Sequence, residues 1–304
     1  MFCANICKAQ FPPAAGKPGS TAINGDSSCF RSWAIEATSQ IGYRQNGLTD
    51  SGFAAVGTNA SVIGPSKKNG ILSLGDGGWA LLKFNPPIIN GQGFDFAVFE
   101  NAFNDSFLEL AHVEVSEDGV RFYRFPSVSL TSTNIQTSSF GATMADSIHN
   151  LAGKYRMPYG TPFDLEDFVD SPEFPSTIYF VKIIDVIGNI ETQKGSIDSR
   201  GNIINDPWPT PFISSGFDLD AVGVINQGQF NSVEKNPILA RIYHNVQQNK
   251  IVFPHQVAWA ELISMNGQFT SLKIENQEAN VDKFSPGIYT IRCNFGLKRI
   301  VISE

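Results

Sequence analysis

Residues 71–84, ILSLGDGGWALLKF, contain two short apolar runs separated by the tight-turn sequence GDGG at residues 75–78. Runs of aliphatic and aromatic residues bounded by glycine and aspartate are typical of strands joined by a turn. Two prolines follow the second run at Pro86 and Pro87, and proline ends a strand because it donates no ladder hydrogen bond. The segment therefore predicts a strand, a turn and a second strand.

Similar runs recur along the chain. An Asp118-Gly119 turn predicts a hairpin, and the segment from Ser132 to Pro175 is expected to be a loop-rich insertion with a short helix at Leu165–Val169. Further strands are expected at Phe94–Phe99, His112–Ser116, Arg121–Phe125, Ile178–Val186 and Phe217–Ile225. Many closely spaced strands with few helical periods predict an all-β fold, specifically a jelly-roll β-sandwich.

The composition agrees with this fold class. Of 304 residues only 17% are charged, while 27 are glycine and 24 are phenylalanine, which favours strands and tight turns over helices. The net charge is −7; from residue 232 onward eight Lys and Arg face six Asp and Glu, or +2, which leaves −9 for residues 1–231. An acidic main domain argues against nucleic acid and anionic membranes as partners and is compatible with cation binding. No run approaches the ~20 apolar residues of a transmembrane helix.

The chain is expected to have four parts. Residues 1–10 resemble the remnant of a secretory signal peptide, although the segment is shorter than the usual ~15–30 residues and lacks a basic start. Residues 11–226 are expected to form the jelly-roll ligand-binding domain, residues 227–236 a linker, and residues 237–304 a small C-terminal β-domain.

The C-terminal part has its own strand signals. Asn266-Gly267 fits a two-residue hairpin turn, Pro286-Gly287 marks another turn, and residues 296–303 form a basic and then apolar final strand. This order of elements resembles the C-terminal sorting domain of type IX secretion. The resemblance implies export by the type IX translocon and its carrier proteins, and a location outside the cell or on the outer-membrane surface. A terminal β-module with no targeting role is the alternative.

Five segments of the main domain resemble a family of secreted cell-surface proteins of Bacteroidota. They are SLGDGG at 73–78, GFDFAVFEN at 93–101, VEVSEDG at 113–119, NLAGKY at 150–155 and GFDLDAV at 216–222. The resemblance covers about residues 11–226. It implies a galactose-binding-like sandwich, akin to discoidin and carbohydrate-binding modules, and no particular reaction.

Acidic residues near strand ends suggest a bound cation, with calcium as the expected ion. Calcium takes six to eight oxygen ligands from carboxylates, amides and backbone carbonyls. Asp218 and Asp220 alternate with apolar residues, so both are expected on one strand face, which is either metal-bound or solvated. Asp198 and Asp206 could add ligands, but their neighbours favour turns. The candidate ligands are Asp95, Glu100, Asn101, Asp185, Asp218 and Asp220.

Aromatic side chains in loops are candidates for stacking on a sugar or another planar ligand. Trp208 is the first candidate because prolines on both sides stiffen its loop, and Tyr155, Tyr159 and Phe163 follow. Core packing is the alternative for each ring.

The sequence argues against an enzyme, because only four histidines occur and no nucleophile has an evident base nearby. A Glu100 and Asp218 pair serving glycoside hydrolysis is the enzymatic alternative. We therefore expect a non-catalytic, secreted or cell-surface protein with a calcium-stabilised domain that binds a glycan or another small ligand. A surface adhesin and a nutrient-capture protein, for example for corrinoids, are the remaining alternatives.

Overall fold

The computed structural model describes residues 11–47, 51–191, 193–228, 241–264, 267–294 and 296–303. The chain folds as two compact units, Met1–Phe230 and Asn231–Glu304, hereafter the front unit and the rear unit. The expected signal remnant at residues 1–10 and most of the expected linker lie outside the described residues.

The front unit is built almost entirely of antiparallel strands. Its helical elements are the 3-10 helices η2 (Asn59–Val62), η3 (Ala145–Ser147) and η4 (Leu165–Phe168), the last within the predicted helix. Its strands are β1 (Ile23–Asn24), β2 (Ser32–Trp33), β3 (Glu36–Gln40), β4 (Leu72–Ser73), β5 (Trp79–Ile88), β6 (Phe96–Glu100), β7 (Ala111–Ser116), β8 (Tyr123–Arg124), β9 (Val128–Ser129), β10 (Ile148–His149), β11 (Tyr159–Phe163), β12 (Ile178–Asp185) and β13 (Asp218–Val224).

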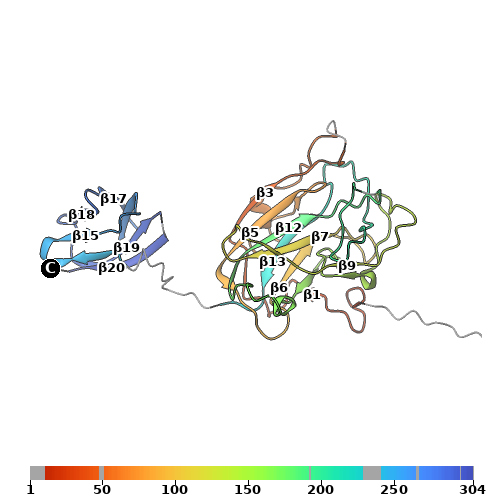
Figure 1. The fold of residues 1–304 in the computed structure, drawn as a ribbon, viewed down its shortest axis with the longest axis horizontal. Coiled ribbons are helices and arrows are strands. Elements are labelled where there is room, and N and C mark those ends of the chain that lie inside the picture. Colours follow the sequence, from red (N-terminus) through yellow and green to blue (C-terminus); the bar gives the residue numbers. More distant parts are fainter. Residues whose placement is uncertain are drawn as a thin grey trace, which may run out of the picture. The chain divides into compact units, whose positions relative to one another are not determined.

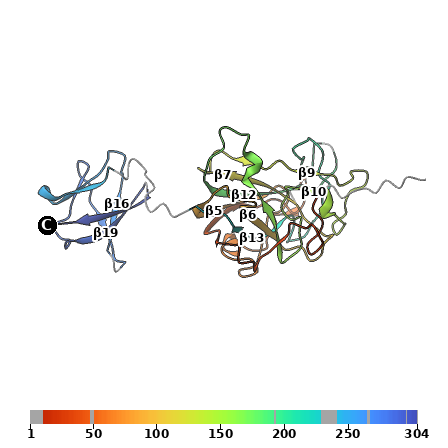
Figure 2. The same ribbon diagram turned by 90° about the horizontal axis from the view of Figure 1, so that it is seen from below.

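Two main sheets form the front unit. One has the order β1-β11-β6-β13-β2, with β4 also paired to β13, and the other has the order β3-β5-β12-β7-β8 (Figure 1). A separate ribbon joins β9 and β10. In Figure 2 the strands β7 and β12 lie on one side of the unit and β6 and β13 on the other.

One hydrophobic core lies between the two main sheets. It combines Leu82 and Val113 from one sheet with Val98 and Val222 from the other, all at most 1% exposed. Burying apolar surface between two sheets is the main stabilising contribution to such a sandwich. The prediction of an all-β sandwich is confirmed.

Strand β13 differs from the sequence prediction, because all seven of its residues are buried. Its second face is covered by a smaller cluster in which Ala221 packs with Phe99, Phe30 and Trp33. Asp218 and Asp220 are 8% and 4% exposed, so the alternative of a solvated strand face is wrong.

The rear unit has its own two sheets, β14-β15-β18 and β17-β16-β19-β20. Its core contains Ile251, Leu262 and Ile291. The strands are β14 (Tyr243–Asn245), β15 (Lys250–Val252), β16 (Ala260–Ser264), β17 (Phe269–Leu272), β18 (Glu278–Asn280), β19 (Gly287–Cys293) and β20 (Gly296–Ile302), with a 3-10 turn η5 (Val246–Gln248). Among the described residues no helix has the length and apolarity needed to span a bilayer.

Candidate functional site

Six buried acidic side chains lie at one end of the front-unit sandwich. These residues, hereafter the carboxylate cluster, are Asp76, Glu100, Glu109, Asp185, Asp206 and Asp218, and each is at most 8% exposed.

Strand topology explains why the cluster forms. Strand β6 ends at Glu100 beside the start of β13, because Glu100 pairs with Leu219. In the opposite sheet β12 ends at Asp185, which pairs with Ala111 at the start of β7. Antiparallel pairing thus brings the end of one strand next to the beginning of its neighbour in both sheets. Glu109 stands two residues before β7, and Asp76 and Asp206 come from loops.

Two of the cluster carboxylates accept hydrogen bonds from backbone N–H groups that are adjacent in sequence to other cluster members. Asp185 accepts from the backbone N–H of Gly77 at 2.9 Å and of Phe217 at 2.7 Å, next to Asp76 and Asp218. The Asp206 Oδ2 atom accepts from the backbone N–H of Leu110 at 3.2 Å, next to Glu109. The carboxylates are therefore held close together by the backbone.

The other cluster members also have fixed partners. Glu100 accepts from the backbone N–H of Ala102 at 2.8 Å, and the Ser73 hydroxyl donates to Asp218. The Asp76 Oδ2 atom accepts from the backbone N–H of Asn46 at 2.6 Å and from the Trp208 indole N–H at 3.0 Å.

Two acceptors in the cluster are left over. The Asp206 Oδ1 atom is buried and has no hydrogen-bond partner in the structure as described. The Glu109 carboxylate also receives no hydrogen bond from the described residues, and the residue is 6% exposed. An unsatisfied buried acceptor such as the Asp206 Oδ1 atom is uncommon in native proteins and calls for an unseen partner.

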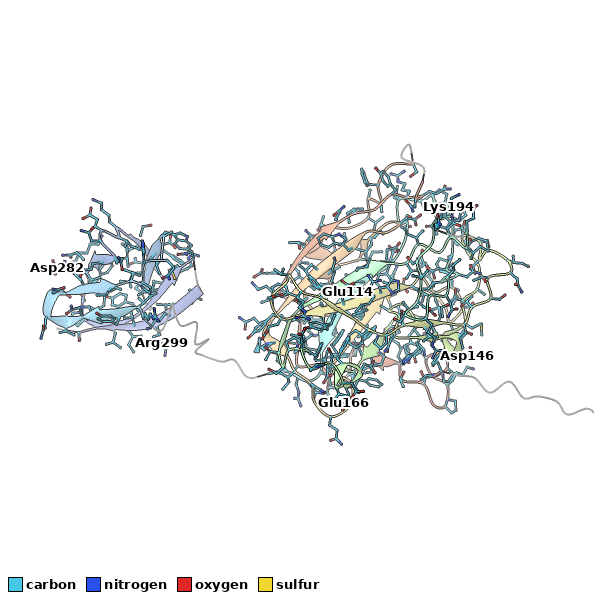
Figure 3. The ribbon with its side chains drawn as sticks, in the orientation of Figure 1. Glu114, Asp146, Glu166, Lys194, Asp282 and Arg299 are labelled. Atoms are coloured by element: carbon cyan, nitrogen blue, oxygen red, sulfur yellow. The ribbon has the colours of Figure 1, made fainter. Side chains whose placement is uncertain are left out.

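The cluster also differs from the acids on the surface. Glu114, on β7, pairs with Arg124 at 2.8 Å, and Lys194 pairs with Glu191. Figure 3 labels Glu114 and Lys194. Within the described part of the chain, no Lys, Arg or His forms such a pair with a cluster carboxylate.

Burial without a counter-charge raises the pKa of the cluster carboxyls. For Glu109, desolvation is the main cause of the raised pKa, followed by repulsion from Glu100, Asp218, Asp206 and Asp185. Desolvation likewise raises the pKa of the other five, and brings that of Asp218 to about 6. At neutral pH such a cluster holds protons or a cation, because several buried like charges cannot stay uncompensated.

This electrostatic arrangement predicts an unusual pH dependence. Without divalent cations, the front unit is expected to be more stable near about pH 5 than near about pH 8. Each cluster carboxyl binds its proton more tightly in the folded chain than in the unfolded chain. The stability it contributes is therefore complete below its unfolded pKa and is lost as the pH rises through its folded pKa, about 6 for Asp218. Thermal unfolding in chelator at several pH values measures this, and a midpoint that climbs steadily from about pH 5 to about pH 8 contradicts it.

As a metal centre, the cluster offers oxygen ligands of the kind that hard cations prefer. In the described ranges, however, no three His, Cys, Asp or Glu side chains are arranged to hold one ion. A cation here would therefore combine fewer carboxylates with neutral oxygens, such as the Ser73 hydroxyl and backbone carbonyls.

The structure brings together three of the six ligands predicted from the sequence, namely Glu100, Asp185 and Asp218. Asp95 lies elsewhere and accepts hydrogen bonds from the Gly91 and Leu165 backbones and the Asn226 side chain.

The remaining two candidates differ in their surroundings. Asp220 accepts from the Ser66 hydroxyl at 2.5 Å and from the Lys67 backbone at 3.0 Å. Asn101 follows Glu100, and its backbone amide lowers the pKa of that carboxyl, against the larger effect of burial.

Sequence reasoning missed Asp76 and Glu109 and gave Asp206 only as a possible addition. Asp76 and Asp206 were both expected in turns, and Asp76 does lie in the turn closed by the Gly78 N–H and the Gly75 carbonyl. Glu109 had a usable signal, since an acidic residue between Leu108 and Leu110 at the start of a buried strand needs a partner.

The predicted aromatic ligand contacts need correction. Tyr155 and Phe163 are 1% and 0% exposed and pack inside the unit, so neither ring offers a face to a ligand. Tyr159 is half-buried beneath the Arg156 guanidinium, 5.3 Å from its ring. Trp208 is half-buried, and its indole N–H is used by Asp76.

A different set of rings is exposed. Phe140 is 74% exposed and lies between Phe107 and Phe212, with ring centroids 5.8 Å and 5.4 Å away. These three residues, hereafter the aromatic ridge, come from three loops. The ridge is fixed to the loop of Trp208, because the Trp208 backbone N–H donates to Thr137 at 3.0 Å.

A polar cavity of about 570 Å³ is formed by the same two loops that carry Phe140 and Phe212. It is lined by residues 129–134 and 201–203, mainly serine, threonine and asparagine. The hydroxyls of Ser129 and Thr131 are buried and without partners in the part of the chain that the structure describes.

Comparison with known proteins adds no assignment. No protein-family model and no curated protein matches this chain.

Proposed function

We propose that this chain is a non-catalytic, secreted or cell-surface protein whose front unit binds a glycan or a similar small polar ligand. Calcium stabilises the front unit, and the rear unit serves as a type IX export module recognised by the translocon and its carrier proteins. The observation that carries the binding function is that the same two loops carry exposed rings of the aromatic ridge and line a polar cavity.

The chemistry of the two features suits a sugar. Aromatic rings stack on the apolar face of a pyranose, and hydroxyl and amide groups exchange hydrogen bonds with its edge. Phe140 offers a ring that is mostly exposed, and the exposed side chains of Ser132, Thr133 and Asn134 line the cavity with hydroxyl and amide groups. The ridge loops are well anchored, because the Ser139 hydroxyl donates to the Pro209 carbonyl at 2.5 Å. Anchored loops reduce the ordering cost of binding.

Support for export is separate from support for binding. The rear unit has a closed core of its own and ends on β20, which pairs with β19 along seven residues from Gly287 to Cys293. A compact unit that folds around its own core can act as a transferable signal, in line with the sorting-domain resemblance of residues 237–304.

A glycan array with the full chain tests the binding function. Phe140→Ser is expected to weaken binding to the preferred glycan about tenfold, because one stacking contact contributes about 1.5 kcal/mol. Val120→Ser is the matched control, since Val120 is 82% exposed on the β7–β8 hairpin, away from the ridge loops. Equal binding by Phe140→Ser and the wild type, or no glycan bound by the wild type, contradicts the proposal.

A further inference from the structure

We infer that the carboxylate cluster is a binding site for one divalent cation of the calcium class, with Glu109 and Asp206 as its principal charged ligands. The inference rests on the calcium-stabilised front unit of the proposed function and deepens it by naming the site.

The first argument is the number of buried carboxylates without a counter-charge. Six of them meet at one end of the sandwich, and no basic side chain of the described residues pairs with any of them. An unpaired buried carboxylate costs several kcal/mol, so a single group of this kind is already unusual. Six together favour a charge-compensating ligand.

The second argument is the position of the unused oxygens. Asp206 holds one oxygen against the Leu110 backbone N–H, whereas its other oxygen is buried and has no donor among the described residues. Glu109, one residue before Leu110, has no donor for its carboxylate in that same part of the chain. Both side chains thus have acceptor capacity left over, on a buried oxygen in the case of Asp206, and a cation requires such free acceptors.

The ligand chemistry selects the type of ion. The cluster supplies oxygen atoms only, which calcium and magnesium prefer over softer metals. Since no three of the acidic side chains converge on one point in the described ranges, neutral oxygens must complete the coordination. Calcium accepts such mixed and irregular shells, whereas magnesium demands a near-ideal octahedron. Calcium is therefore the better match.

Binding at this site would also hold the ligand surface in place. Asp206 begins the loop that continues through Trp208 to Phe212 of the aromatic ridge. The indole of Trp208 already donates to Asp76, another cluster member. A cation fixed by Asp206 would thus stiffen the loop from which Phe212 projects.

Calorimetric titration of the chelator-treated full chain with calcium chloride tests the site. The wild type is expected to bind one ion, and Glu109→Gln and Asp206→Asn are expected to weaken calcium binding at least about tenfold. Asp220→Asn is the matched control, because Asp220 is equally buried but has its own donors from Ser66 and Lys67. It should keep the wild-type affinity.

Thermal unfolding provides a second test, because a cation ligand and a purely structural carboxylate predict changes of opposite sign in the unfolding midpoint. In chelator, Glu109→Gln is expected to raise the unfolding midpoint by about 2–4 °C, because it removes one of several buried like charges, and calcium should no longer raise the midpoint further. A purely structural carboxylate would instead lower the midpoint when replaced.

No heat of calcium binding by the wild type, or unchanged affinity in both Glu109→Gln and Asp206→Asn, overturns the inference. Glycan binding and export are measured independently of calcium affinity, so the failure of this site is distinguishable from the failure of those functions.

Discussion

Asp95→Ala is expected to lower the free energy of unfolding of the front unit by about 3 kcal/mol or more. The Asp95 carboxylate is fully buried and accepts from the Gly91 N–H at 2.8 Å, the Leu165 N–H at 2.7 Å and the Asn226 amide at 2.9 Å. Alanine leaves two backbone N–H groups without an acceptor, and each costs about 1–3 kcal/mol. Denaturant unfolding of the full chain measures the loss.

Asp164→Ala is the control for this prediction. Asp164 directly precedes Leu165, which donates to Asp95. The Asp164 side chain accepts only from the Glu166 N–H, at 3.0 Å, as the cap of η4. The loss there should be about 1 kcal/mol, as for an ordinary cap. If the loss for Asp95→Ala is no larger than for Asp164→Ala, or appears only with calcium present, Asp95 is not the structural acceptor described here.

Attachment of residues 231–304 to a reporter protein that carries a signal peptide is expected to move the reporter from the periplasm to the surface of a Bacteroidota host. The expected effect is all or none, because a sorting signal is either recognised or not. The rear unit has its own core around Leu262 and Ile291, so it should fold without the front unit. Protease accessibility on intact cells measures the outcome.

Ile291→Asp in the same fusion is the matched control. A carboxylate in place of a side chain that is 0% exposed should unfold the rear unit and leave the reporter in the periplasm. Equal surface exposure of the reporter with and without residues 231–304 contradicts the sorting role.

Much of the strand content followed from local chemistry, but β11 (Tyr159–Phe163), a strand of the main sheet, lies inside the segment that was expected to be a loop-rich insertion. The two runs within residues 71–84 contain β4 and the first part of β5, and glycines at Gly75 and Gly77 take the left-handed backbone that the predicted turn needs. The rear hairpin lies where it was predicted, with Gly267 at a φ of 82°, but Ser264 pairs with Gln268, so its loop has three residues and not the predicted two. Turn residues and alternating apolar positions act over a few residues, so they are visible in sequence.

Burial of the second face of β13 did not follow from the sequence. Alternation places Asp218 and Asp220 on one side of a strand, but it does not show what lies against that side. In the structure, Ser73 and Ser66 supply hydroxyl donors to the two acids from segments about 150 residues away. The same is true of Tyr155, whose loop position suggested exposure but whose hydroxyl bonds to Thr21 at 2.8 Å inside the unit.

By itself the sequence determined an all-β chain with a separate C-terminal β-unit, because strand period and turn chemistry are local properties. Only the tertiary structure decided which acids meet. Glu100 and Asp218 come from one sheet, Asp185 from the other, and Glu109 and Asp206 from the connections between strands. Their proximity arises from pairing between strands that are far apart in the sequence, which no local pattern records. The repulsion between buried carboxylates, on which the proposed cation site rests, exists only in the folded front unit, where the two sheets bury them together.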